Sequence, residues 1–161
     1  MNTDTKGKSE MGNTYLKFIL MLIASFISMY ITMYLNTFEF DHVYFSLTRF
    51  YMTCMGISAM AVIMLSFMLN MYTNKRKNLL IYLSSLVLFV GSLVLVRVQK
   101  PIGDVLWMKA MIPHHSIAVL TSGRADIKDR KVKKLAEDII RAQKKEIAEM
   151  KTMIKRLENK E

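Results

Sequence analysis

A segment rich in methionine and histidine, in the C-terminal part of the chain, carries the side chains best suited to chemistry. It reads WMKAMIPHH over residues 107–115 and contains Met108, Met111, His114 and His115. Thioether sulfur is a soft ligand and imidazole nitrogen is a versatile one, and together they suit Cu(I) or Ag(I). Residues 99–161 hold no cysteine, which excludes a zinc site of the cysteine-rich structural kind. The segment therefore predicts a soft-metal site.

A second stripe of polar and methionine side chains follows later in the chain. Its members Gln143, Glu146, Met150 and Met153 fall on the apolar face of one helix, where an unpartnered polar group is costly. Two histidines with one glutamate would suit Cu(II) or Zn(II) instead. The predicted ligands come from both stripes, with Gln143 secondary or placed behind them: Met108, Met111, His114, His115, Glu146, Met150 and Met153.

Each of these side chains also has a simpler role open to it. Methionine on a helix face is more often core filler than a ligand. A histidine at a helix seam is usually only hydrogen-bonded, and Gln143 or Glu146 can serve to fix the register of a bundle. Metal binding is favoured by the combination of M-x-x-M-x-P-H-H with a facing polar and methionine stripe.

Two helices must position these side chains. Asp104 is the predicted N-cap of the first, which should reach about Ser122 and stop at Gly123. Pro113 lies inside this helix and predicts a kink or a local break beside the two histidines. At 100° per residue, the two methionines share a face with His115, while the adjacent histidine projects about 100° away.

The second predicted helix begins after Asp129 and runs from Arg130 to about Asn159. Its apolar side chains form one stripe opposite the lysines and arginines: Val132, Leu135, Ala136, Ile139, Ile147, Met150, Ile154 and Leu157. The short turn favours an antiparallel hairpin. Two hairpins would complete a four-helix bundle, so we expect a homodimer through this domain.

Three long hydrophobic runs precede the hairpin. The chain has 161 residues, 52% of them hydrophobic, and a formal net charge of +10. The runs cover about residues 15–35, 50–72 and 78–98, and each is near the roughly 20 residues that an α-helix needs to cross a bilayer. We therefore expect an all-α protein with three transmembrane helices followed by the antiparallel hairpin.

The loop between the second and third runs sets the expected orientation. It reads TNKRK over residues 73–77, and basic short loops are cytoplasmic. This predicts a cytoplasmic tail over 1–14, a membrane region over 15–98 and an extracytoplasmic hairpin domain over 99–161. Glu39, Asp41 and His42 then lie on the hairpin's side of the membrane. His42 is a possible extra ligand there, although we expect it to be a solvated loop residue.

The hairpin sequence closely resembles the family called domain of unknown function 305. The resemblance covers about residues 104–157 and rests on Met-x-Pro-His-His at 111–115, followed by Leu135, Ala136, Ile139, Ile140, Gln143, Glu146, Ile147 and Met150. The three-run N-terminal region is similar to that of the membrane-anchored bacterial branch. The resemblance implies a ferritin-like helical fold and, as in some periplasmic members, copper or silver bound through Met and His. One hairpin is half of such a bundle, which again favours a dimer.

These observations lead to two functional hypotheses. The first is a protein of the bacterial cytoplasmic membrane that binds Cu(I), or Ag(I), for sequestration or for handover to another envelope protein. The second is an assembly module that binds no metal. A di-metal enzyme is not expected, because such sites need several inward-facing glutamates with Glu-x-x-His spacing and residues 99–161 contain no Glu-x-x-His. The lysine-rich face lacks interleaved aromatic residues, so we expect it to be a solvated face with no nucleic acid as a partner. The lipid bilayer is the partner expected from the three hydrophobic runs.

Overall fold

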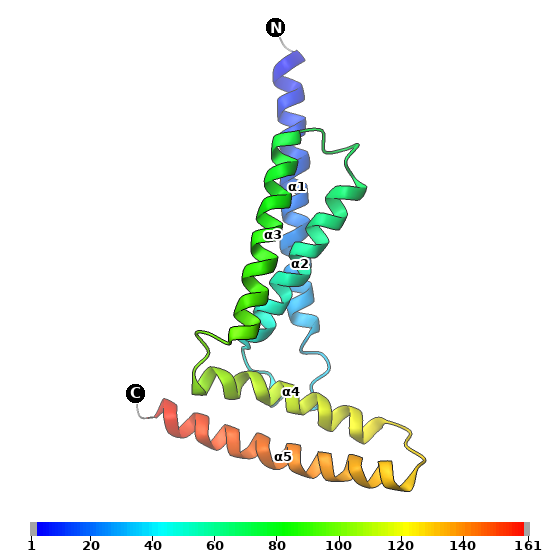
Figure 1. Cartoon of the computed structure of the whole chain (residues 1–161), viewed down its shortest axis with the longest axis vertical. Coiled ribbons are helices and arrows are strands. Elements are labelled where there is room, and N and C mark those ends of the chain that lie inside the picture. Colours follow the sequence, from blue (N-terminus) through cyan, green and yellow to red (C-terminus); the bar gives the residue numbers. More distant parts are fainter. Residues whose placement is uncertain (1–2, 160–161) are drawn as a thin grey trace. The chain divides into compact units, whose positions relative to one another are not determined.

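The computed structural model describes residues 3–159, and within them every regular element is a helix (Figure 1). The chain divides into two compact units. One unit holds the chain up to Ile31 together with Phe50–Val98, and the other holds Thr32–Arg49 together with the chain from Gln99 onward. The predicted all-α class is therefore confirmed.

The first unit contains the three long apolar helices. They are α1 (Thr3–Thr32), α2 (Leu47–Phe67) and α3 (Lys75–Val98). All of α2 and α3, and Thr14–Thr32 of α1, are long and apolar enough to cross a membrane. The prediction of three helices able to span a membrane, followed by further helices, is confirmed.

The core of this first unit explains where its second helix ends. Tyr72 is almost fully buried, with its ring centroid 5.2 Å from those of Tyr15 and Phe18. The Tyr15 hydroxyl donates to Asn78 Oδ1 at 2.6 Å, and Asn78 Nδ2 donates to the Tyr72 carbonyl at 2.6 Å. Because the chain must turn to bring Tyr72 back into this core, α2 stops at Phe67 and does not reach residue 72 as expected. The first helix likewise ends at Thr32 in a turn, three residues before the predicted end.

The second unit contains the predicted hairpin and one further element. Helices α4 (Asp104–Arg124) and α5 (Arg130–Glu158) run side by side and antiparallel, as the sequence predicts (Figure 1). The further element is η1 (Phe40–His42), a short 3-10 helix in the loop between α1 and α2. It contacts α4, so this loop is part of the same unit as the hairpin.

The ends of α4 differ from the prediction. Gly103 is the N-cap and makes no side-chain cap, while Asp104 lies within the first turn, where its charge favours the helix dipole. The helix passes Gly123 and ends at Arg124, because the Ala125 amide still donates to the Thr121 carbonyl. Pro113 is buried inside α4 without breaking it.

The start of α5 agrees with the prediction and offers a direct test. The Asp129 carboxylate accepts hydrogen bonds from the amides of Lys131 and Val132, at 2.8 and 2.9 Å. Replacing Asp129 by alanine should cost about 1 kcal/mol of stability, since both amides lose their partner. Thermal unfolding of the full chain in detergent measures this loss. Asp126→Ala is the control, because its ion pair with Lys128 is exposed and should contribute almost nothing.

Candidate metal centre

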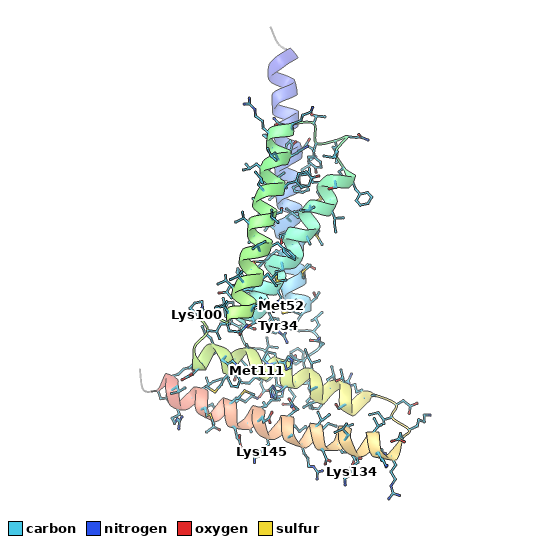
Figure 2. All side chains as sticks on the ribbon, in the orientation of Figure 1. Tyr34, Met52, Lys100, Met111, Lys134 and Lys145 are labelled. Carbon is cyan, nitrogen blue, oxygen red and sulfur yellow. The ribbon has the colours of Figure 1, made fainter. Side chains whose placement is uncertain are left out.

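The seam between α4 and α5 brings together thioethers from both helices. Met108 of α4 and Met150 of α5 are buried in one cluster with Ile112, Ile147 and Ile154, and the half-buried Met111 packs against it. Figure 2 shows Met111 on α4, and shows Lys134 and Lys145 on the side of α5 that faces away from α4. The strongly amphipathic pattern of α5 thus places Met150 in the seam and Lys134 and Lys145 on the opposite side of the helix.

His115 and Glu146 meet across the same seam. The Nε2 atom of His115 lies 2.7 Å from Glu146 Oε2, and its Nδ1 atom lies 2.9 Å from the Met111 carbonyl oxygen. A carbonyl oxygen only accepts, so Nδ1 carries a proton and Nε2 faces the carboxylate. At 2.7 Å the contact requires a proton on Nε2 or on the carboxylate. A metal ion must displace that proton to bind here.

Three further candidate ligands, His114, Gln143 and Met153, are exposed or only partly buried. His114 is exposed, with its ring centroid 5.9 Å from that of His115 and the two planes 66° apart. Gln143 is half-buried on α5. Met153 is 44% exposed and does not belong to the buried cluster. The buried set of soft donors is therefore smaller than the predicted ligand list.

A cavity connects the exposed methionine with a buried one. It has a volume of about 380 Å³ and lies where the start of α4 meets the end of α5. Met108 and Met153 both line it, together with Trp107, Asp104 and Arg156. Solvent thus has access to the Met108 end of the seam.

The loop between α1 and α2 docks on α4 through a buried serine. Ser116 is fully buried, and its Oγ atom accepts the Phe38 amide at 2.7 Å and lies 2.9 Å from His42 Nδ1. His42 is only 6% exposed, so the expectation of a solvated loop residue is wrong. Tyr44 extends the docking, since it packs against the hairpin cluster.

Charged contacts from α5 complete this docking. Lys151 donates to Asp41 Oδ2 at 2.5 Å, and the Lys144 ammonium lies 5.2 Å from the centre of the Phe38 ring. The hydrogen bond from Lys151 lowers the pKa of Asp41. Burial, with a further contribution from the Lys151 charge, lowers the pKa of His42, against the opposing effect of Asp41 and Glu39. The pairing of Asp41 with a lysine so distant in sequence carries no local signal, and sequence reasoning missed it.

These two shifts predict that acid weakens the loop docking in the metal-free protein. A depressed His42 pKa means that the unfolded chain binds the proton more readily, so stability falls as the pH drops below about 6.5. The depressed Asp41 pKa acts in the same direction at lower pH, below its ordinary value of 3.8. Hydrogen exchange of the Phe38 amide between pH 7.5 and 5, corrected for intrinsic rates, should show falling protection. The His42→Gln variant should lack this dependence, because the Asp41 effect lies below this pH range.

Comparison with known proteins agrees with the family resemblance of the hairpin sequence. The family model described as Domain of unknown function (DUF305) matches residues 95–161. A protein of uncharacterised function from Acanthamoeba polyphaga mimivirus is 33% identical over 147 residues, which are 88% of this chain and 95% of that protein. No solved structure matches the chain significantly. This chain belongs to the DUF305 family.

Proposed function

We propose that this protein is a membrane-anchored binder of a soft monovalent cation, Cu(I) or Ag(I), and that the α4–α5 hairpin holds the ion. The observation that carries the proposal is the burial of Met108 and Met150, from opposite helices, in one cluster beside Met111. Thioethers held together in a seam are a donor set for soft ions. His115 adds an imidazole one helical turn from Met111, with its Nδ1 proton already engaged by a carbonyl.

The proposed role is sequestration or handover, not catalysis. The exposed Met153 and the cavity that it shares with Met108 offer a route by which an ion enters or leaves the seam. The basic loop TNKRK supports an orientation with the hairpin outside the cytoplasm, and the proposed location is the bacterial cytoplasmic membrane. Methionine suits such an oxidising compartment, where thiols are lost to disulfides.

Titration of the full chain in detergent tests the proposal. Cu(I) is added anaerobically against a competing chelator, and Ag(I) serves as a probe that is stable to oxidation. His115→Ala should weaken binding by about 10-fold or more, since the seam loses its imidazole and the partner of Glu146. His114→Ala is the matched control and should bind like the unaltered protein, because its side chain is exposed. Equal affinities in all three proteins would contradict a ligand role for His115.

A second candidate function, assembly through the hairpin without metal, is supported by a different feature. Val132 and Leu135 are 49% and 59% exposed on the apolar stripe of α5, so a second copy would find apolar surface there. In this case Gln143→Leu would be neutral or stabilising. Leu135→Lys would shift a dimer to monomer in light scattering of the detergent-solubilised chain. A monomeric unaltered protein would contradict this function.

A further inference from the structure

We propose that Glu39, Asp41 and His42 form a second cation site, distinct from the thioether seam, and that it binds a divalent ion of the Zn(II) or Cu(II) class. The site lies in and beside η1, within the loop that docks on α4. It shares no ligand with the hairpin seam and does not depend on the proposed Cu(I) function.

The distances within this cluster suit coordination better than hydrogen bonding. His42 Nε2 lies 3.6 Å from Glu39 Oε2 and 3.6 Å from Asp41 Oδ1. Both contacts exceed the 2.7–3.2 Å range of an N–H···O hydrogen bond. Two ligand atoms that each lie about 2.1 Å from a tetrahedral Zn(II) ion are roughly 3.4 Å apart. All three ligand atoms lie within 4.8 Å of one another, so small side-chain rotations would close them on one ion.

The imidazole of His42 is already fixed in an orientation that suits metal binding. The His42 side chain is only 7% exposed, and Ser116 engages its Nδ1 atom from α4. Metal-binding histidines commonly engage their second ring nitrogen in this way, which orients the ring and selects the tautomer. Nε2 makes no hydrogen bond within the described part of the chain and faces the two carboxylates.

The carboxylates determine which ion the site accepts. Lys151 donates a hydrogen bond to Asp41 Oδ2, while Oδ1 faces His42, so this hydrogen bond orients the carboxylate. Glu39 and Asp41 are more than half exposed, which leaves room for water in the open coordination positions. One nitrogen and two oxygen ligands, with no sulfur, favour a borderline divalent ion over Cu(I).

Zn(II) titration of the full chain in detergent by calorimetry tests the site, with Cu(II) as the spectroscopic probe. The unaltered chain should bind one Zn(II) with an affinity that falls about 10-fold or more in Glu39→Gln. This variant keeps the Ser116 contacts, so loss of folding does not explain a loss of binding. Glu137→Gln removes an exposed carboxylate elsewhere on the hairpin and should leave the affinity unchanged.

The Cu(II) electron paramagnetic resonance spectrum identifies the ligand. It should contain a coupling from one imidazole nitrogen that disappears in His42→Gln and persists when His114 and His115 are both replaced by alanine. The proposal is overturned if the unaltered chain binds no Zn(II), if Glu39→Gln binds as tightly, or if the nitrogen coupling comes from the hairpin histidines.

Discussion

Replacing Met108 and Met150 together by leucine should lower the Cu(I) affinity of the chain by about 100-fold or more, while the hairpin remains folded. Leucine keeps nearly the volume of methionine and removes only the sulfur, so each exchange should cost less than about 1.5 kcal/mol. Loss of an outer-shell partner alone weakens metal sites by roughly 10- to 100-fold, and loss of two direct ligands should cost at least the upper end of that range. Competition titration measures the Cu(I) affinity, and thermal unfolding of the same samples measures the stability.

This variant distinguishes a ligand role of the buried methionines from a packing role. Burial alone does not distinguish them, because it is expected for both roles. If Met108 and Met150 are only core filler, the double exchange leaves Cu(I) affinity unchanged and alters stability slightly. Met64→Leu is the matched control, since Met64 packs against the core of the first unit. An equal loss of affinity in the control would point to methionines of the membrane helices as the ligands.

The parts of the fold that could be predicted are those that a local pattern determines. Three hydrophobic runs of sufficient length, with at most one charged residue each, predict membrane helices. The three- and four-residue apolar spacing of residues 130–158 predicts an amphipathic helix. Where a helix begins or ends depends on small energetic differences between neighbouring residues that could cap it. Asp129 acts as an N-cap as predicted, whereas Asp104 yields that position to Gly103 and lies inside α4. Both residues carry the same cap signal, so sequence alone does not separate them.

In the candidate site, too, some features could be predicted from the sequence and others could not. Helical periodicity places His115 and Glu146 on facing stripes of the hairpin, and the structure brings their side chains within 2.7 Å. Periodicity also places Met153 on the stripe of α5. It does not account for the open end of the hairpin, where Met153 borders a cavity and is partly exposed. Register along a helix is predictable, but local packing at the end of a hairpin is a tertiary property.

Nothing in the sequence of residues 32–49 predicts their docking on α4. The contacts of this loop join Phe38 and His42 to Ser116, and Asp41 to Lys151, across separations of about 75 to 110 residues. Such pairings depend on how the loop packs against the hairpin, and no periodic pattern in the sequence predicts this packing. The docking changes the experimental design as well. A fragment that begins at residue 100 would lack these contacts, so the full chain is the proper sample.

Ser116→Ala should therefore have an effect that the sequence of α4 does not suggest, with a loss of about 2–4 kcal/mol in the stability of the loop and hairpin unit. The serine is fully buried, and its Oγ atom serves both the Phe38 amide and His42 Nδ1. Alanine leaves both groups without that partner, at about 1–3 kcal/mol for the buried His42 nitrogen and about 1 kcal/mol for the part-buried Phe38 amide. Unfolding of the full chain in detergent measures the loss, and hydrogen exchange at Phe38 localises it.

The control for this variant is Thr121→Ala, which also removes a hydroxyl from α4. The Thr121 hydroxyl is exposed and bonds only carbonyls of its own helix, so its loss should be nearly neutral. Ser116→Ala should also weaken Zn(II) binding by about 10- to 100-fold, because His42 loses the contact that orients its ring. Unchanged Cu(I) affinity in the same variant would show that the two sites are separate. A stable Ser116→Ala protein with full protection at Phe38 would mean that other contacts, such as Lys151 with Asp41, hold the loop on the hairpin.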